Sequence, residues 1–333
     1  MRSTIARVRG INYPWAMFNG KANYGCDFGV NIWGSHAGVT AHAAEVAEDF
    51  AAMASMGVEV VRWFVFTDSR GGVRWNGNGD VAGLTDGFFD DLDAALTIAR
   101  ETGLRLCLVL FDYSWMLPRD APDPPGAAPV VMRRRALATP EGRARVFDAV
   151  IDPVLARYGA GGSQAGLGRA IHSFDVINEP DWVMKRRRAE LRAFVRGVAD
   201  RVHARTSSLV TVGGGRVKFA AEWDDPAYDL DFVQVHLYPS VRHPRRDRRL
   251  VGQPAAALGL GKPVLIGEFP GNGDRVCPPD HDPPPYSLSD YLDMADRGGY
   301  LGAWPWSFKG VDGFGAVNPG EYRTALARAA RSG

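Results

Sequence analysis

The chain has 333 residues, of which 46% are hydrophobic and 23% are charged, and it contains nine Trp. This composition excludes a disordered chain and is typical of a soluble globular protein that buries a sizeable core. The formal net charge is +1, so the balance of charge alone indicates no nucleic-acid or membrane partner. Two small domains would fit the length, but α/β barrels routinely occupy more than about 250 residues as one domain. We therefore expect a single domain over residues 1–333.

Three runs of positive charge stand out, at residues 133–135, 185–188 and 245–249. A nucleic-acid surface is one interpretation of such runs. Acidic residues balance the total, however, and no nucleic-acid motif accompanies the runs. We therefore interpret them as solvated helix faces and loops, and expect no nucleic-acid partner.

The cysteines and the apolar stretches limit the cellular setting. Three cysteines exclude a dense disulfide framework. Cys107 lies in an apolar run and is predicted to be a buried thiol, whereas Cys26 and Cys277 lie in irregular segments and a pairing between them stays open. No apolar stretch approaches the roughly 20 residues of a membrane span. The first residues lack the apolar core of a signal peptide, so the chain as written predicts a cytoplasmic protein, although a trimmed secreted protein would read the same way.

Short apolar segments rich in β-branched and aromatic residues recur along the chain, and each is followed by a loop and then by a helical pattern. This alternation predicts a parallel sheet covered by helices. The strand candidates number eight, at residues 8–15, 58–66, 104–113, 174–179, 209–213, 231–238, 263–269 and 301–307. Helical patterns lie at residues 41–56, 88–102, 141–158, 189–204, 218–223, 253–260, 288–297 and 322–330.

Eight strand–helix units predict an α/β fold, namely a single (β/α)8 TIM barrel. Two long connections, at residues 16–40 and 117–139, follow the first and third strands and are rich in Gly, Pro and aromatic residues. In such a barrel the loops that follow strands lie on the face where active sites form. We therefore look for chemistry at the ends of the strands.

Two glutamates occur at the ends of predicted strands. The fourth strand ends in Asn178-Glu179-Pro180, and the seventh ends in Gly267-Glu268-Phe269. If both side chains face the barrel axis, the two carboxylates converge above an apolar floor. Burial raises the pKa of a carboxyl group and a nearby cation lowers it, so such a pair can hold two protonation states at one pH. Glycoside hydrolysis needs this division between an acid and a nucleophile. A lone Glu would ordinarily indicate a salt bridge, but here there are two.

These residues, together with His236-Leu237-Tyr238 in the sixth strand and Trp306-Ser307-Phe308 in the eighth, resemble clan A glycoside hydrolases. Within that clan the sequence is most similar to glycoside hydrolase family 5, the cellulase and β-mannanase group. The resemblance extends from Gly10-Ile11-Asn12 to Trp306, nearly the whole chain. It implies that Glu179 is the acid/base and Glu268 the nucleophile of a retaining mechanism, with no metal and no cofactor.

The resemblance also implies roles for neighbouring residues. Asn178 would bind the sugar 2-hydroxyl, although its strand parity opposes that of Glu179, so the strand must end in a bulge or twist. Tyr238 would orient the nucleophile, and His236 would orient the acid/base.

Charged and aromatic residues complete the predicted site. Arg62 lies inside an apolar strand, where an unpaired charge is costly, and the resemblance implies an ion pair that holds Glu268 deprotonated. Trp306 would form a platform beneath the sugar ring. Further loop tryptophans are candidates for additional sugar subsites, namely Trp33, Trp115, Trp182 and Trp223. Where family members often carry a His at the end of the third strand, this chain has Asp112 and Tyr113, and either is a candidate replacement.

Other chemistries find little support. No zinc-protease motif, Walker loop or dinucleotide fingerprint is present, and Gly213-Gly214-Gly215 is not followed by the expected pattern. We therefore expect a retaining β-glycoside hydrolase whose partner is an oligosaccharide or polysaccharide of glucosides, mannosides or related sugars. Two alternatives stay open, a transglycosylase that uses the same site and a non-catalytic carbohydrate-binding barrel. The sequence leaves the sugar, the endo or exo mode and the oligomeric state undecided.

Overall fold

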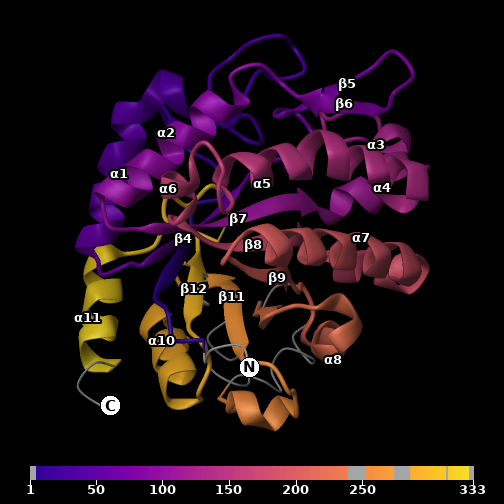
Figure 1. Ribbon diagram of the computed structural model, residues 1–333. Helices are drawn as coiled ribbons and strands as arrows, with labels where there is room; N and C mark the ends of the chain where they lie inside the picture. The colour runs from indigo at the N-terminus through magenta and orange to yellow at the C-terminus, as the bar shows by residue number, and fades with distance from the viewer. Residues whose placement is uncertain (1–4, 239–251, 274–285, 313, 330–333) are drawn as a thin grey trace.

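The computed structural model describes residues 5–238, 252–273, 286–312 and 314–329 (Figure 1). Within this part of the chain, all eight predicted strands are present and form two parallel sheets of five and three strands. In order across the first sheet they are β1(Gly10–Asn12), β4(Val60–Phe64), β7(Arg105–Asp112), β8(Ile171–Asn178) and β9(Leu209–Gly213). The second sheet contains β10(Val233–His236), β11(Val264–Pro270) and β12(Ala303–Trp306).

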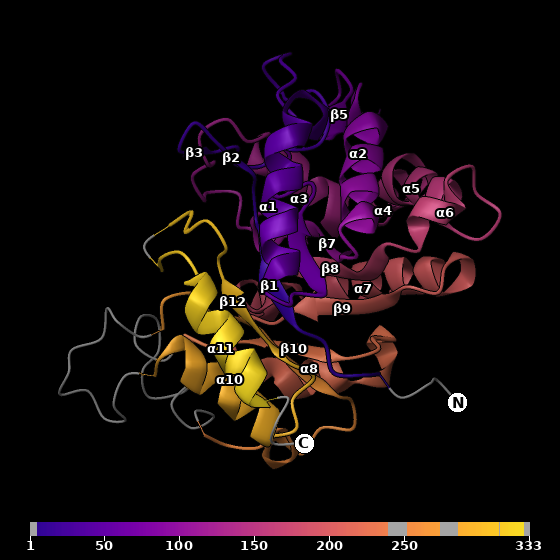
Figure 2. The ribbon, with the colours of Figure 1, turned by 90° about the vertical axis from the view of Figure 1, so that its left-hand side faces the viewer.

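Hydrogen bonds outside the strand ladders join the two sheets at both edges. The backbone N–H of Val8, before β1, donates to the carbonyl oxygen of Leu301, before β12, at 2.8 Å. At the other edge the N–H of Asp231 donates to the carbonyl oxygen of Val210 in β9 at 2.9 Å. The strands thus follow one another around a ring with helices outside it (Figure 2), which is the predicted (β/α)8 architecture.

Alternation along β4 shows how the strands divide their side chains. Val61 and Trp63 pack in the large core between the strands and the helices. Val60 and Phe64 belong instead to two smaller clusters. Arg62 lies between these two residues on the same side of the strand, so strand parity directs it toward the inside of the ring.

A small apolar cluster fills the inside of the ring near the beginnings of the strands. Gly10 provides the space for the Trp304 indole, because a Cβ atom on Gly10 would lie 2.4 Å from that ring. This cluster supplies the apolar floor that the sequence predicts beneath the two glutamates. Its buried members are Val8, Val60, Cys107, Phe232, Leu265, Leu301 and Trp304.

Most predicted helices are present outside the strands (Figures 1 and 2). The third helical pattern consists of two α-helical segments joined by a π-helical turn at Phe147–Ile151. The helices of the described residues are α1(Ala43–Ser55), α2(Phe88–Glu101), α3(Val130–Ala138), α4(Pro140–Val146), α5(Asp152–Tyr158), α6(Ala165–Gly168), α7(Met184–Arg205), α8(Ala220–Asp224), α10(Leu288–Arg297) and α11(Pro319–Ala329).

Two expectations need correction. Residues 253–260 do not form an α-helix but only the 3-10 turn Ala255–Leu258, which begins after Pro254 and ends at Gly259 in the left-handed region. The long connection over residues 117–139 contains α3. Arg133 is not solvated either. It is buried, and its guanidinium donates to the carbonyl oxygens of Ala128 and Ser114.

The long loop after β1 and the connection after β4 each contain a short antiparallel hairpin. One pairs β2(Met17–Phe18) with β3(Lys21–Ala22), and the other pairs β5(Val73–Trp75) with β6(Val81–Leu84). Cys107 is buried as predicted, whereas the open pairing of Cys26 involves Cys277, which lies outside the described residues. In the described part of the chain no helix has the length and apolar character of a membrane span. The single-domain expectation stays a prediction.

Candidate active site

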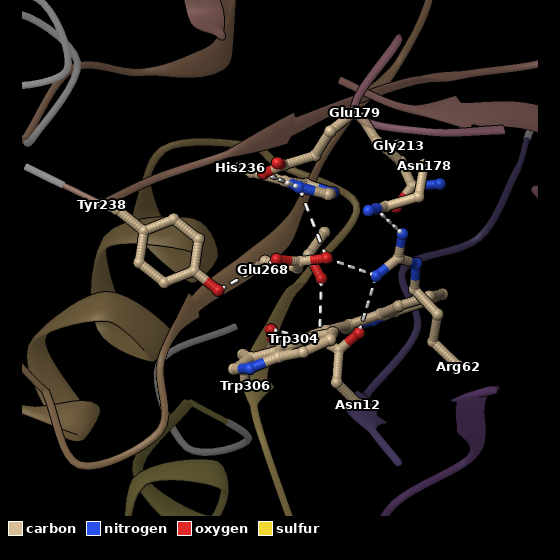
Figure 3. Close-up of polar contacts among 12 residues, drawn as sticks. Asn12, Arg62, Asn178, Glu179, Gly213, His236, Tyr238, Glu268, Trp304 and Trp306 are labelled. Atoms are coloured by element: carbon tan, nitrogen blue, oxygen red, sulfur yellow. Dashed lines mark hydrogen bonds and ion pairs between the residues drawn. The ribbon is translucent and has the colours of Figure 1, made fainter. Parts of the chain in front are cut away.

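The two predicted carboxylates meet at the carboxyl ends of their strands (Figure 3). Glu179 directly follows β8, and Glu268 lies in β11. Both side chains are buried, and one carboxylate oxygen of each lies within 4.8 Å of the other. Residues 89 positions apart in the sequence therefore face one small space.

A local change of backbone conformation brings both Asn178 and Glu179 into the site. Glu179 has φ 46° and ψ 40°, in the left-handed region, and the pairing of β8 with β9 shifts register between Asp175 and Asn178. The Glu179 N–H donates to the carbonyl oxygen of Gly213 at 2.7 Å. This is the strand irregularity that the opposite parities of Asn178 and Glu179 require. A non-glycine residue in this region is strained, which is common at functional sites.

The glycines at the end of β9 and just after it make room for these side chains. A Cβ atom on Gly213 would lie 2.7 Å from the Arg62 guanidinium, and one on Gly215 would lie 2.8 Å from Cγ of Glu179. The sequence interpretation considered this Gly-rich run only as a nucleotide motif and therefore missed its role. The signal that was available is the position of the run, directly after a strand at the active-site end of a barrel.

Arg62 is fully buried and connects four groups of the site. Its Nη1 donates to Glu268 Oε1 at 2.6 Å and to Asn12 Oδ1 at 3.0 Å. Its Nε donates to Asp175 Oδ2 at 3.0 Å, and its Nη2 donates to Asn178 Oδ1 at 2.8 Å. Burial by itself would lower the pKa of Arg62, but the carboxylates of Asp175 and Glu268 outweigh it and raise the pKa. The predicted contact with Glu268 is therefore present, and the guanidinium stays charged. Asp175 and Asn12 are further members that sequence reasoning missed.

Tyr238 and His236 contact the carboxylates from the β10 side. The Tyr238 hydroxyl donates to Glu268 Oε2 at 2.9 Å. Burial, followed by the charges of Glu268 and Glu179, raises the pKa of Tyr238 well above its usual value, so the hydroxyl keeps its proton. His236 Nδ1 lies 3.2 Å from Glu179 Oε1 and 3.4 Å from Glu268 Oε1. The imidazole thus lies between the two carboxylates rather than beside Glu179 alone.

Trp182 contacts Glu179 directly. Its indole N–H donates to Glu179 Oε2 at 2.7 Å, and the Arg216 guanidinium lies 3.8 Å from the centre of its ring. The ring is 36% exposed. Trp182 was predicted as a candidate for a further sugar subsite, and the structure shows that it also fixes one oxygen of the candidate acid/base.

Asp112 orients Asn178. Its Oδ2 accepts a hydrogen bond from Asn178 Nδ2 at 3.0 Å, and its Oδ1 accepts one from the backbone N–H of Ser114 at 2.9 Å. Burial raises the pKa of Asp112 to about 6. Of the two candidate replacements for the third-strand His, Asp112 therefore lies in the network. The Tyr113 ring lies next to Trp182, with ring centres 6.3 Å apart.

Trp306 lies across Glu268 from Glu179 in Figure 3. Its indole packs edge-on against Trp15 and Phe64 and donates to Asp312 Oδ2 at 2.7 Å. Its position is thus fixed beside the carboxylates. Its role as a sugar platform stays a prediction.

The other tryptophans lie elsewhere. Trp115 and Trp223 are fully buried, and their indole N–H groups donate to the carbonyl oxygen of Thr67 and to Asp181 Oδ1. These two residues belong to the core and do not line a subsite. Trp33 is 61% exposed and packs over Gly126, and in the described residues no recorded contact joins it to either glutamate.

Glu179, His236 and Glu268 are also close enough together to suit a metal ion. Arg62 already lies 2.6 Å from Glu268 Oε1, and a second cation at that oxygen would meet its repulsion. The absence of a metal from the reaction stays our prediction.

No protein-family model and no curated protein matches the chain. Solved structures share its fold. The β-mannanase from the blue mussel Mytilus edulis is 17% identical, with a TM-score of 0.71 over 98% of this chain and 92% of that chain. The β-1,4-D-mannanase from Cryptopygus antarcticus is 16% identical, with a TM-score of 0.71 over 96% and 90%. A glycoside hydrolase family 5 mannosidase from Rhizomucor miehei is 14% identical, with a TM-score of 0.54 over 98% and 94%. The chain thus resembles, in fold, the family that its motifs predict.

Proposed function

We propose that the chain is a retaining β-glycoside hydrolase that acts on β-mannosides, with Glu179 as the acid/base and Glu268 as the nucleophile. The observation that carries this proposal is the approach of one oxygen of each carboxylate to within 4.8 Å of the other. Retaining enzymes place the two carboxyl groups about 5–5.5 Å apart, whereas inverting enzymes leave about 6.5–9.5 Å for a water molecule. The gap in this site suits direct attack by a carboxylate.

The first step uses the different partners of the two glutamates. Arg62 and Tyr238 each fix one oxygen of Glu268, which leaves a charged and oriented carboxylate for attack on the anomeric carbon. As the bond from Glu268 to carbon forms, the bond from carbon to the leaving oxygen breaks, and that oxygen takes the proton of Glu179. The product is a glycosyl-enzyme and a free leaving group.

The second step reverses these roles. Glu179, now ionised, takes a proton from a water molecule, and the oxygen of that water attacks the anomeric carbon. The ester bond to Glu268 breaks, and the sugar leaves with its original configuration. Asn178, held between Asp112 and Arg62, keeps a second amide N–H and a second lone pair on its oxygen, and we assign the N–H to the sugar 2-hydroxyl.

Support for mannosides comes from the solved structures with this fold, which are named as mannanases and as a mannosidase. β-Glucosides and related sugars belong to the same reaction class. A panel of aryl β-glycosides, mannan and glucan therefore tests the choice of sugar.

The proposal is tested by proton NMR of the first-formed sugar during hydrolysis of an aryl β-mannoside. We expect the β-anomer to appear first and the α-anomer to follow only by mutarotation. An α-anomer as the first product would contradict the retaining assignment. The same experiment at high sugar concentration separates hydrolysis from transglycosylation, because transfer yields longer glycosides. Binding of the sugar without any turnover would favour the non-catalytic alternative.

A further inference from the structure

A hollow with a volume of about 520 Å³ adjoins the Glu179 side of the site. Its walls come from the segments that follow β7, β8 and β9 and from two helices. The lining consists of residues 116–120, residues 181–183, residues 185–187 at the start of α7, Arg216, Phe219 and Arg134 of α3. Small-molecule pockets commonly measure about 300–1,000 Å³. The hollow therefore has the size and the place in the barrel of a ligand site.

The charge of this cationic pocket is strongly unbalanced. Its lining contains two carboxylates, Asp120 and Asp181. Asp181 is buried and already accepts hydrogen bonds from the N–H of Arg216 and from the Trp223 indole. Burial raises the pKa of Asp181 to about 7, so it carries only part of its charge near neutral pH. Against these stand six cationic side chains, Arg119, Arg134, Lys185, Arg186, Arg187 and Arg216.

Most of these cations face the pocket without a carboxylate partner. Arg187 pairs with Glu190 at 3.1 Å. For the other five, no ion pair within 4 Å is found among the described residues. The pKa of Arg134 is lowered by burial and by the charges of Arg187 and Arg119, and Nε of Arg216 is buried without a hydrogen-bond partner in the described structure. An anion in the pocket would relieve this repulsion.

The neighbouring cations show that this arrangement is particular to the pocket. Arg188 follows directly in α7 but does not line the pocket, and it pairs with Glu222 at 3.3 Å. Arg192, one helical turn further along, pairs with Asp225 at 2.8 Å. The run at residues 185–188 is therefore not one uniform solvated face, because its first residues line a hollow while its last residue forms a surface ion pair.

Trp182 connects the pocket to the chemistry, since it lines the pocket and donates to Glu179 Oε2. Under the proposed function, Glu179 protonates the oxygen between the sugar and its leaving group, so the leaving group lies on the Glu179 side. Trp306, the predicted sugar platform, lies on the other side of Glu268 from Glu179 (Figure 3). The cations thus face the leaving group rather than the sugar that Glu268 attacks.

We propose that the cationic pocket binds an anionic leaving group, so that the preferred substrates are β-glycosides whose aglycone carries a carboxylate, sulfate or phosphate. This inference rests on the proposed function for the identity of the leaving-group side. The binding of the anion itself is measurable without turnover. Because the charges are partly exposed to solvent, the preference falls as salt rises.

The test is calorimetric binding of three aryl β-mannosides to the Glu268→Gln variant, in which turnover is removed. One carries a carboxymethyl group on the aryl ring, the second the neutral carbamoylmethyl group of nearly the same shape, and the third a phosphonomethyl group. At low salt we expect the anionic ligands to bind about tenfold more tightly than the amide, a difference of about 1.4 kcal/mol. The preference should shrink in high salt. A stronger preference for the phosphonate assigns phosphate as the natural group, and a stronger preference for the carboxylate assigns an acid.

Variants place the effect in the pocket. Arg134→Gln and Arg186→Gln, each in the Glu268→Gln background, should reduce the anionic preference several-fold. Arg188→Gln removes a neighbouring charge that is paired outside the pocket, so it should leave the preference unchanged. Equal affinities for the three ligands, failure of all three to bind, or an equal loss in Arg188→Gln would overturn the proposal.

The outcomes also separate this proposal from the function on which it rests. If the wild type hydrolyses no β-glycoside and the variant still prefers the anionic ligands through Arg134 and Arg186, the hydrolase assignment fails while the anion pocket stands. If the neutral mannoside is hydrolysed with retention and the three ligands bind equally well, the pocket proposal fails while the hydrolase assignment stands.

Discussion

The two glutamates of the site share His236 of β10, but their other contacts come from different parts of the barrel. Glu268 is held from inside, where the fully buried Arg62 of β4 and Tyr238 each take one of its oxygens. Glu179 lies at the rim, where one of its oxygens accepts a hydrogen bond from the partly exposed Trp182. The contrast teaches that the sheet sets the position of the candidate nucleophile, whereas a loop residue helps to set that of the candidate acid/base.

A charge network inside the sheet changes little when loops change, because its members belong to the strands that form the barrel. Loop residues at the rim vary more freely, and here they also form the cationic pocket. Under the proposed function, the attack on the sugar would thus depend on the barrel, and the selection of the leaving group on its loops.

The largest expected effect comes from Glu268, the glutamate that is held inside the barrel. Glu268→Gln keeps the shape of the side chain but removes the attacking carboxylate, so we expect kcat/KM for every β-mannoside to fall by about 10⁴-fold or more. Steady-state kinetics measure the loss, and circular dichroism checks the fold. Turnover close to that of the wild type would break the assignment of the nucleophile.

Arg62→Met tests the network that holds Glu268. The change leaves the carboxylates of Glu268 and Asp175 buried without their cation, and loss of one partner of a buried pair costs about 3–5 kcal/mol. Urea unfolding measures the loss of stability. The matched control is Arg188→Met. Arg188 is exposed, although its partner Glu222 is not, and a pair with one solvated partner should contribute no more than about 1 kcal/mol. Similar losses in both variants would contradict the central place of Arg62.

Glu179→Ala tests the role of the glutamate at the rim. Poor leaving groups need a proton and activated aryl leaving groups do not, so we expect a loss of about 10²–10⁴-fold for the former and a much smaller loss for the latter. Rates for a series of aryl β-mannosides with different phenol acidities give the answer. An equal loss across the series would show that Glu179 is not the acid.

Trp182→Phe sharpens the same comparison. Phenylalanine keeps an aromatic ring but removes the hydrogen bond to Glu179 Oε2, and we expect about a tenfold loss for poor leaving groups, equivalent to about 1.4 kcal/mol, because hydrogen bonds to charged groups contribute about 1.5–3 kcal/mol. The activated substrates should lose less. Trp33→Phe is the control, since Trp33 makes no recorded contact with either glutamate among the described residues. A loss of activity of the same size for poor and for activated leaving groups would indicate a structural role only.

The last expected effect is on stability and concerns Asp181, which lines the cationic pocket beside Trp182. Its pKa is raised from the ordinary value to about 7 by burial, so the folded state holds a proton that the unfolded chain releases near pH 4. Stability therefore falls as pH rises from about 4 to about 7. Asp181→Asn lacks this titration, so urea unfolding should show the wild type losing stability relative to the variant over that window. A constant difference between the two would contradict the raised pKa.

The sequence predicts the frame of this site well. Eight strands follow from runs of apolar residues, because strands buried on both sides are apolar along most of their length. The positions of Glu179 and Glu268 follow from their places at strand ends. The need for a charged partner at Arg62 follows from the cost of a lone charge in an apolar strand.

Other parts depend on contacts between distant residues, which no local pattern encodes. Asp175 accepts a hydrogen bond from Arg62, which lies 113 positions away in the sequence. The residues around Asp175 in the sequence do not indicate this partner. Gly215 is needed because the side chain of Glu179 passes close to it, and this close approach exists only once the strands are assembled.

Two further differences have local causes. Residues 253–260 have a helical pattern of apolar residues, but Pro254 and Gly259 limit them to a single turn. The hairpin at β2 and β3 turns at Asn19 and Gly20, which both have positive φ. An Asn-Gly pair is a strong hairpin signal, so this element was available from the sequence.

The most direct test of the account is the capture of the glycosyl-enzyme. A 2-deoxy-2-fluoro-β-mannosyl fluoride slows both steps but keeps a good leaving group, so the intermediate accumulates. We predict that intact-mass measurement shows the addition of one fluorosugar and that peptide mapping places it on Glu268. A label on another residue, or rapid hydrolysis of ordinary substrates with no label ever formed, would contradict the central claim.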